Sequence, residues 1–316
     1  PKGNRWGFFP AVSLGYRVSQ EDFFKNALPF IDNFKIRGSV GRLGSDASIS
    51  NTMTYFSTAG LSSDPCVVFG TTPLKDMGMS GPVCPDLKWQ ITDSYNIGFD
   101  ADLWHGLLGV ELDVFYMKTS RSLAGQSGKF PPSLGNWYPA YINYGSHDNR
   151  GFELVLTHRN KIKDFNYYVK GNVSFARNRI LKTIEDSDVP LYKRRTGKRI
   201  GETLGFVATG LFQSEEEIAK SAVFEGSTNT KPGDVKMKDI NGDGVISWAQ
   251  DMVPISRSST PEMMFGLNIG GDWKGFDFNM FWQGAAMFDV DLCGIYDSGI
   301  RDNTFYTKPF YDQGNT

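Results

Sequence analysis

The clearest chemical pattern in this chain lies in a short stretch rich in Asp, Asn and Gly. Asp239, Asn241 and Asp243 stand at alternate positions. Gly244 follows where the backbone must turn sharply, and the Val245 carbonyl is next in line. Oxygen ligands at this spacing are those that a calcium ion takes in a helix-flanked loop. The stretch therefore predicts a loop that could bind calcium.

The end of this stretch departs from the calcium pattern. At the twelfth position, where a bidentate Glu normally closes the loop, this chain has Gln250. Asp251, one residue further on, would have to supply the closing carboxylate. The alternative is a turn whose Asn and Asp side chains satisfy their own backbone without any ion. From the sequence, both interpretations stay open.

Residues for catalysis do not come together in the same way. The three histidines, His105, His147 and His158, have no metal-binding spacing, and no nucleophile motif lies near them. The sequence therefore predicts a protein that is not an enzyme, with calcium as the one cofactor to consider.

Composition excludes several further classes. The 33 Lys and Arg residues are balanced by 35 Asp and Glu, so the chain has no basic excess for a nucleic-acid partner. Gly at 35 residues and aromatics at 14% favour turns and β-structure. No apolar run is long enough for a transmembrane helix, but the alternating strands of a membrane barrel would leave only a weak hydropathy signal.

Alternation of apolar and polar residues predicts the elements that must position these groups. In one segment Val110, Leu112 and Val114 share a face, while Glu111 and Asp113 take the other. Such segments run for about nine to eleven residues, which is the span of a tilted transmembrane strand. Eight segments show the pattern: 9–17, 34–41, 89–103, 109–118, 150–157, 165–175, 263–271 and 276–284.

The connections between the segments alternate in length. Those at 104–108, 158–164 and 272–275 are short, whereas those at 42–88, 119–149 and 178–262 are long. Short turns at one end and long loops at the other are typical of an outer-membrane barrel. We expect an all-β fold, a transmembrane antiparallel β-barrel, with about eight strands in this chain and long extracellular loops. The polar residues Lys170, Asn172 and Asn279 would face its interior.

Two other architectures fit parts of the pattern. A soluble β-sandwich that serves as a surface binding or adhesion module would need a second apolar layer to cover these faces. A small autonomous outer-membrane barrel would close from these eight strands alone.

Local signals add smaller expectations. Ser19 could cap a short helix within 19–33, and Ser214 could cap an exposed helix over 215–220. Cys66 and Cys84 fall in the same long loop, where an oxidising compartment would allow a disulfide, although unpaired thiols are the alternative.

Aromatic side chains gather in the loop predicted over 119–149. Trp137, Tyr138 and Tyr141 could offer stacking platforms for sugars and are the candidate ligand-binding residues. The alternative is that these rings pack the loop against its neighbours.

Several short blocks of a recognisable kind stand in order along nearly the whole chain. They are Gly7-Phe8-Phe9-Pro10, Leu87-Lys88-Trp89-Gln90, Asn96-Ile97-Gly98-Phe99-Asp100, Asn149-Arg150-Gly151-Phe152-Glu153, Gly201-Glu202-Thr203-Leu204-Gly205, the Asp239 stretch with the preceding Pro232-Gly233-Asp234, and Trp273-Lys274-Gly275-Phe276-Asp277. Together these blocks resemble the SusC/RagA family of TonB-linked outer-membrane proteins.

This resemblance implies a barrel of about 22 strands, filled by a plug domain, in the bacterial outer membrane. Such proteins import oligosaccharides or peptides with energy from TonB, ExbB and ExbD, under a SusD-like surface lipoprotein. Residues 1–316 would then be part of the barrel domain, without the plug and the C-terminal closing strands. The start at Pro1 agrees with a piece of a longer precursor.

Overall fold

A computed structural model describes most of the chain and divides it into two units. The described residues are 4, 6–46, 59–70, 72–79, 84, 86–126, 130–131, 133, 141–185, 189–227 and 229–290. The first unit comprises Pro1–Ile200 and Met263–Gly284, and the second Gly201–Glu262 and Ala285–Thr316.

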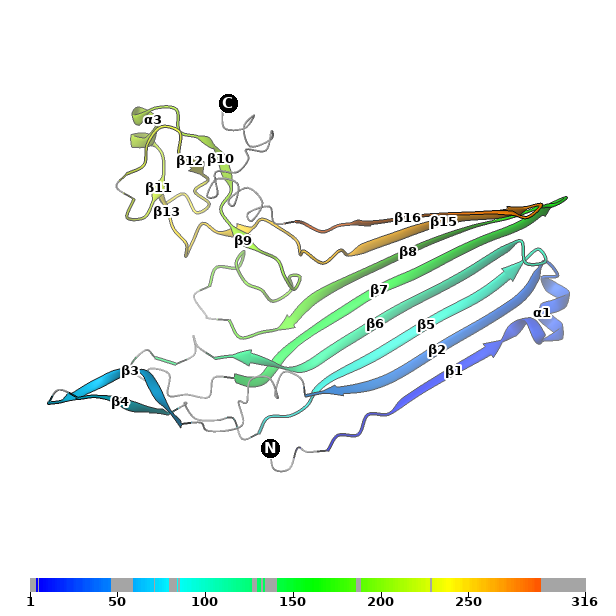
Figure 1. Ribbon diagram of the computed structural model, residues 1–316, viewed down its shortest axis with the longest axis horizontal. Helices are drawn as coiled ribbons and strands as arrows, with labels where there is room; N and C mark the ends of the chain where they lie inside the picture. The colour runs from blue at the N-terminus through cyan, green and yellow to red at the C-terminus, as the bar shows by residue number, and fades with distance from the viewer. Residues whose placement is uncertain are drawn as a thin grey trace. The chain divides into compact units, whose positions relative to one another are not determined.

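The first unit is built on one eight-stranded antiparallel sheet in which each strand pairs with the next of the eight along the chain (Figure 1). Its strands are β1 (Ala11–Arg17), β2 (Ile31–Ser45), β5 (Gln90–Leu103), β6 (Leu108–Gly125), β7 (Tyr141–Ile162), β8 (Phe165–Lys182), β15 (Met263–Trp273) and β16 (Phe276–Ala286). All eight predicted segments are confirmed as strands. The sheet is open in this chain, with β1 and β16 at its edges.

Several strands are longer than the alternating pattern predicted. β6 has 18 residues and β7 has 22. Residues 119–125 and 141–149, expected in a loop, therefore belong to strands, and this part of the loop prediction was wrong. The backbone ladder between β6 and β7 continues to Gly125 and Tyr141, because main-chain pairing does not require the apolar alternation on which the prediction rested.

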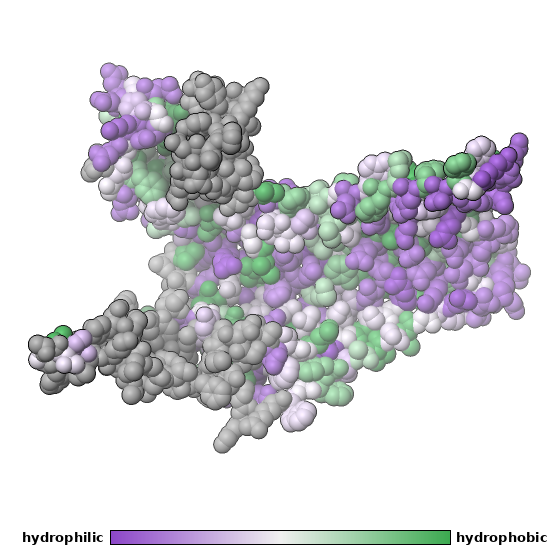
Figure 2. Space-filling view, viewed as in Figure 1, coloured by the Kyte–Doolittle hydropathy of each residue, from purple (hydrophilic) through white to green (hydrophobic). Residues whose placement is uncertain are grey.

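The pleat separates the residues of the sheet onto two faces. Val40, Tyr95 and Tyr116 lie side by side on one of them, the apolar face. Large apolar side chains on this face stay exposed, including Ile97 at 62% and Leu14 at 76%. In the described part of the chain the other sheets have only two strands each, so no second layer covers the apolar face and the β-sandwich alternative is wrong. Figure 2 shows hydrophilic side chains gathered over the strands near the short turns.

Short turns at all three places are confirmed, but they are tighter than predicted. Leu108 belongs to β6, residues 158–162 belong to β7, and Asp272 and Trp273 belong to β15. Two of the turns have clear backbone causes. In the β15–β16 turn, Lys274 and Gly275 have φ of 47° and 90°, as a two-residue type I′ hairpin requires. In the β5–β6 turn, the Asp32 carboxylate accepts hydrogen bonds from the backbone N–H groups of His105 at 2.5 Å and Gly106 at 3.2 Å. An acidic side chain from β2 thus fixes the turn between β5 and β6, the next two strands of the sheet.

The connection from β1 to β2 contains a 3-10 turn, η1 (Val18–Gln20), and a short helix, α1 (Asp22–Ala27). The helix begins after Glu21 and has no side-chain cap. Ser19 is buried within the 3-10 turn, so the expectation that it caps the helix was wrong.

The first long loop contains a hairpin that alternation did not reveal. It is formed by β3 (Ala59–Phe69) and β4 (Thr72–Met79), whose register shifts on both sides of Pro65. These irregularities break the period of two on which strand prediction depends. Cys84 has a free thiol. The side chain of Cys66, its predicted disulfide partner, lies outside the described residues.

The second unit is small and irregular. It contains the helix α3 (Glu215–Lys220) and the strand pairs β9 (Leu204–Gly205) with β14 (Val253–Pro254), β10 (Ala208–Leu211) with β12 (Val235–Met237), and β11 (Val223–Phe224) with β13 (Val245–Ile246). Phe212 and Ile246 are buried at 3% and 1% exposure. The Phe206 ring meets the rings of Phe224 and Trp248 edge to face at 5.1 and 5.0 Å. The unit therefore has a miniature core of its own.

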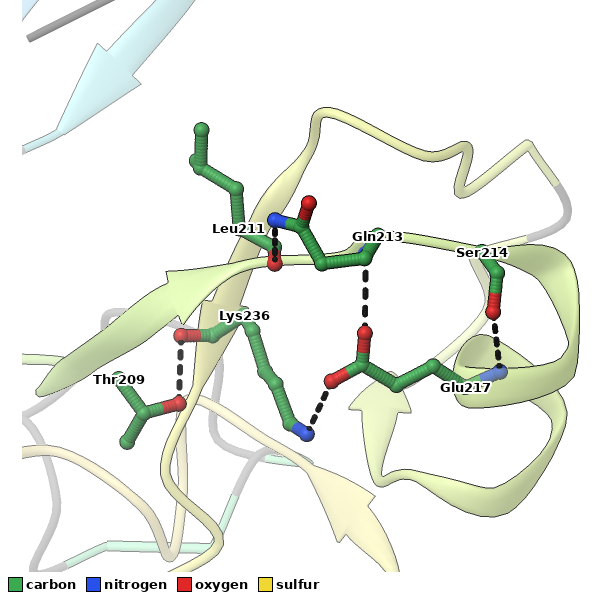
Figure 3. Close-up of polar contacts among 6 residues, drawn as sticks. All are labelled: Thr209, Leu211, Gln213, Ser214, Glu217 and Lys236. Atoms are coloured by element: carbon green, nitrogen blue, oxygen red, sulfur yellow. Dashed lines mark hydrogen bonds and ion pairs between the residues drawn. The ribbon is translucent and has the colours of Figure 1, made fainter. Parts of the chain in front are cut away.

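The N-terminus of α3 is tied to the β10–β12 pair (Figure 3). The Ser214 Oγ accepts a hydrogen bond from the Glu217 N–H at 3.2 Å, so the predicted cap is confirmed. The Glu217 carboxylate bonds the Lys236 Nζ at 2.8 Å and the Gln213 N–H at 2.9 Å. These two contacts hold the pKa of Glu217 below its usual value, the bond to Lys236 being the larger cause.

Candidate functional site

The polar face of the sheet carries an ionic cluster that spans three strands. The Arg37 Nε donates to Asp100 Oδ1 at 3.1 Å, and its Nη2 lies 2.5 Å from Asp113 Oδ2. Arg37 lies on β2, Asp100 on β5 and Asp113 on β6. One guanidinium therefore crosslinks β2, β5 and β6. At this point of the polar face the charged side chains form ion pairs with one another.

Glycine at position 98 permits this crosslink. Gly98 is opposite Arg37 on one side and opposite Asp113 on the other. A Cβ at position 98 would stand 2.6 Å from both Asp113 Oδ1 and the backbone carbonyl oxygen of Leu112. Any larger residue would therefore occupy the space across which the arginine reaches.

A second polar group lies on the same face toward the short turns. The Tyr168 hydroxyl accepts a hydrogen bond from the Asn279 Nδ2 at 3.1 Å and donates to the Asn268 Oδ1 at 3.4 Å. Tyr168 and Asn279 line a hollow together with Arg159 and Asp272. Lys170, opposite Asn268, and Asn172, opposite Gly266, belong to this face as the sequence predicted. The polar face thus carries amide, hydroxyl and charged groups.

The predicted calcium stretch forms a compact turn in the second unit. The two Asp239 carboxylate oxygens accept hydrogen bonds from the N–H groups of Gly242 at 2.6 Å and Gly244 at 2.8 Å. Asp243 Oδ1 accepts from the Val245 N–H at 2.9 Å. The structure thus brings Asp239, Asp243 and Val245 together around the turn.

Asn241 lies within the same turn. Its Nδ2 donates to Asp243 Oδ2 at 2.8 Å and also to Gln250 Oε1, while its Oδ1 accepts from the Asp243 N–H at 3.2 Å. The side chains therefore bond their own backbone, as expected of a turn that supports itself.

Asp251 is placed differently from the other candidate ligands. Its side chain is fully buried, at 0% exposure. Asp251 Oδ1 accepts from the Ile240 N–H, and Oδ2 from the Ser247 N–H, each at 2.8 Å. The carboxylate therefore fastens both ends of the turn to one point. Burial acts to raise its pKa, but the backbone hydrogen bonds outweigh burial and hold the pKa below its usual value.

Metal-binding and catalytic groupings are not found in the described part of the chain. No group of three or more His, Cys, Asp or Glu side chains among the described residues is placed to hold a metal ion. The His158 Nε2 lies 3.2 Å from the Tyr167 hydroxyl, and His105 pairs with Asp32 at 3.3 Å. Calcium binding by Asp239, Asn241, Asp243, Val245 and Asp251 stays a prediction, since Asn and carbonyl ligands fall outside that grouping.

The predicted ligand-binding rings are only partly described. Trp137 and Tyr138 lie outside the described residues. Tyr141 is the first residue of β7, opposite Gly125, and is exposed, so its assignment to a loop was wrong. Contact of these rings with a sugar stays a prediction.

Sequence reasoning missed the Arg37 cluster. Arg37, Asp100 and Asp113 each fit the polar side of an alternating segment, but only the strand register shows that they meet across Gly98. The signal that could have revealed them is a glycine on the polar face of one strand with opposite charges on its two neighbours.

Among the described residues, the helices are all too short or too polar to pass through a lipid bilayer.

Comparison with known proteins agrees with this arrangement. The family model described as "TonB dependent receptor-like, beta-barrel" matches residues 1–311. TonB-dependent receptor P26 of Formosa agariphila is 27% identical over 318 residues, which are 97% of this chain and 30% of that protein. TonB-dependent receptor SusC of Bacteroides thetaiotaomicron is 26% identical over 331 residues, 97% of this chain and 31% of SusC. The chain thus spans about a third of the relatives it matches.

Solved structures show the same fold. The RagAB peptide importer in its open-open state superposes with a TM-score of 0.65 at 18% identity, over 90% of this chain and 29% of that one. Its closed-closed state gives the same TM-score over 91% of this chain and 30% of the other. The open meander, its two unlike faces and the family match lead to one conclusion: this chain belongs to the TonB-dependent receptor β-barrel family, as part of a receptor of the SusC/RagA type.

Proposed function

We propose that this chain forms part of the wall of an outer-membrane transporter that imports nutrients with energy from TonB, ExbB and ExbD. The observation that supports the proposal most strongly is the uninterrupted eight-strand meander with one apolar and one polar face. Such a sheet suits a barrel whose outside meets lipid and whose inside meets water. A protein of this kind resides in the bacterial outer membrane.

The chain's own part in transport is structural. Its polar face offers paired charges, such as Arg37 with Asp113, and amide groups such as Asn279. These groups can bind water and contact a polar solute inside a lumen. They are not arranged as a general acid, a general base and a nucleophile. We therefore propose that the chain lines a route and is not an enzyme.

The proposed cargo is an oligosaccharide or a peptide, delivered through a SusD-like surface lipoprotein. Support comes from the relatives: one is SusC, and the superposed structures are those of the RagAB peptide importer. Trp137, Tyr138 and Tyr141 are the proposed contacts for a sugar, because a ring face stacks on the apolar side of a pyranose. Replacing all three by Ala in the full-length receptor should weaken glycan binding and leave peptide binding unchanged.

The test uses the full-length receptor with its natural flanking regions, expressed in an outer membrane. We expect it to resist carbonate washing, to shift its electrophoretic mobility on heating, and to co-purify from detergent with a surface lipoprotein. Release by carbonate would overturn the membrane assignment. Membrane retention without any lipoprotein would keep the barrel but reject the partner.

We also propose that the turn around Asp239 takes calcium, with oxygens of Asp239, Asn241 and Asp243 and the Val245 carbonyl as ligands. The residue types and their spacing support this proposal, and backbone hydrogen bonds already hold the turn in shape. Asp251 would close the loop from the buried side. An ion would relieve the repulsion between carboxylates that lie close together.

Calcium titration of the receptor, followed by proteolysis of residues 229–262, tests this second proposal. Calcium should slow cleavage of the wild type and have no effect on Asp243→Ala. Equal cleavage of the wild type with calcium and with chelator would show that the turn is held by its backbone bonds alone.

A further inference from the structure

The apolar face of the sheet ends in a row of charged residues on the side of the long loops. The strand register places these residues directly beside one another on five successive strands: Arg42, Asp93, Lys118, Asp148 and Arg179. We call them the rim row. Arg42, Asp93 and Lys118 lie two residues beyond Val40, Tyr95 and Tyr116 on the same strands. The rim row therefore lies on the apolar face rather than on the face of the Arg37 cluster.

Part of the rim row is internally neutralised. The Arg42 Nε lies 2.7 Å from Asp93 Oδ1, and the Arg179 Nη2 lies 3.2 Å from Asp148 Oδ2. Lys118, between the two acids, is exposed and makes no ion pair with any carboxylate in the described ranges. The row thus keeps a positive charge on β6.

Arg150 adds a second exposed cation next to Lys118. It is opposite Tyr116 on β6 and opposite Arg177 on β8. The Arg177 guanidinium lies over the Phe175 ring, 5.2 Å from its centroid. Like charges directly opposite each other on antiparallel strands are unfavourable. Lys118 is the diagonal neighbour of Arg150, so the two lie close enough to share one anion.

The height of these cations matches the edge of a bilayer. From Leu108, at the short turn, to Lys118 is ten residues, which at the usual rise and tilt corresponds to about 26 Å along the barrel axis. The apolar band of outer-membrane barrels is about 25 Å tall. Lys118 and Arg150 therefore stand where lipid headgroups begin, with the Tyr95 and Tyr116 rings, 6.3 Å apart, at the same level.

An apolar hollow lies directly below the rim row. It is lined by Val40, Tyr95, Ile97, Val114 and Tyr116, with Gly38 among them. Gly38 pairs with Leu14 on one side and Ile97 on the other. Because it has no side chain, it leaves a recess between larger neighbours. A recess of this kind, below a pair of exposed cations, suits a molecule with a hydrocarbon chain and an anionic head.

We propose that Lys118 and Arg150, flanked by Arg42, bind the phosphate of a lipid headgroup in the leaflet next to the long loops, while an acyl chain of the same lipid occupies the hollow at Gly38. Arginine offers a planar pair of donors to a phosphate, and lysine adds a point charge. Tyr116, directly opposite Arg150, adds a hydroxyl donor to the same face. This inference rests on the proposed membrane location.

The experiment uses the full-length receptor, purified in detergent and titrated with phosphatidic acid, with diacylglycerol of the same chains, and with inorganic phosphate. Binding is read by native mass spectrometry. The wild type should retain phosphatidic acid and release diacylglycerol and free phosphate. K118Q/R150Q should bind phosphatidic acid about 30-fold more weakly, since each cation near an anionic lipid contributes about a factor of five. Affinity of the wild type should fall as salt is raised.

The matched control is R159Q/K170Q, which removes the same two residue types from the polar face. Its affinity for phosphatidic acid should stay within about twofold of the wild type. Equal affinity of K118Q/R150Q and the wild type, salt-independent binding, or equal binding of free phosphate would each overturn the proposal. Heat-modifiable mobility of the wild type is scored separately, so failure of the barrel assignment is distinguished from failure of the lipid site.

Discussion

The eight-stranded sheet and the second unit handle their apolar side chains in opposite ways. Leu14 and Phe276 in the sheet are 76% and 77% exposed, whereas Phe212 and Ile246 in the second unit are buried. The sheet therefore depends on surroundings that are themselves apolar, while the second unit depends on contacts within itself. Substitutions should therefore change the stability of the sheet by altering its contact with the surrounding medium. In the second unit they should change stability by removing internal hydrogen bonds and packing.

The largest effect is expected at Asp251. Asp251→Ala would leave the part-buried N–H groups of Ile240 and Ser247 without acceptors, at a cost of about 2 to 5 kcal/mol of local stability. Hydrogen exchange of the Ile240 amide in the full-length receptor measures this loss. Glu216→Ala, at an exposed position of α3, is the control and should leave that exchange unchanged. Unaltered exchange of the Ile240 amide in Asp251→Ala would show that the Asp251 carboxylate does not hold the turn together.

The same residue gives the second unit a dependence on acid. Because the folded pKa of Asp251 lies below its unfolded value, its contribution is present above that unfolded value and is lost as the pH falls through the folded one. Protection of the Ile240 amide should therefore decline below about pH 4. Asp251→Asn, which has no charge to lose, should show no such decline.

The next effect is expected on the apolar face of the sheet. Val114→Arg should destabilise the full-length receptor by about 2 to 4 kcal/mol in lipid vesicles, because it places a charge in the apolar band. Val155→Arg, on the polar face opposite Glu111, is the matched control and should cost less than about 1 kcal/mol. Urea unfolding in vesicles distinguishes them, and equal losses would mean that the two faces do not differ in environment.

A smaller effect tests the packing of the sheet itself. Gly98→Ala would force a Cβ against the Leu112 carbonyl oxygen and should cost about 1 to 3 kcal/mol. Gly171→Ala meets nothing within 4 Å and should be neutral or slightly stabilising. Urea midpoints of the two variants give the comparison. Should both glycines tolerate Ala equally, the space at Gly98 would not be needed for Arg37 to reach Asp113.

The smallest effect is expected at the cap of α3. Ser214→Ala removes the acceptor of the Glu217 N–H and should cost about 1 kcal/mol. Faster hydrogen exchange of the Glu217 amide, with no change in Ser221→Ala, would confirm the cap. An unchanged Glu217 amide would show that the contact of Glu217 with Lys236 alone holds this helix end.

The same contrast explains what could be predicted from sequence. Phe276, Phe278 and Met280 alternate with polar residues, and this alternation predicts β16, because a sheet with one apolar and one polar face has a simple period of two. The hairpin of β3 and β4 has an irregular register around Pro65 and gave no such period. The strands of the eight-stranded sheet are therefore far easier to predict from sequence than the strands in its loops.

Contacts between distant residues were harder to predict than elements. Asp251 was identified as an acidic residue near the turn, but its hydrogen bonds to Ile240 and Ser247 depend on how the chain folds back over eleven and four positions. The meeting of Arg37 with Asp113 depends on the register of three strands. Residue type and spacing predict candidates, while tertiary structure decides which atoms face each other.

The extra length of β6 and β7 has a mechanical consequence. From Lys118 to Gly125 the paired strands continue for seven residues beyond the rim row, a rise of about 18 Å at the usual tilt. Although its register shifts around Ser122, this two-stranded ribbon stays hydrogen-bonded to its end and projects beyond the rim row. Whatever docks on the loops would be held clear of the headgroups, and a force applied there would reach the barrel wall through backbone hydrogen bonds rather than through a flexible tether.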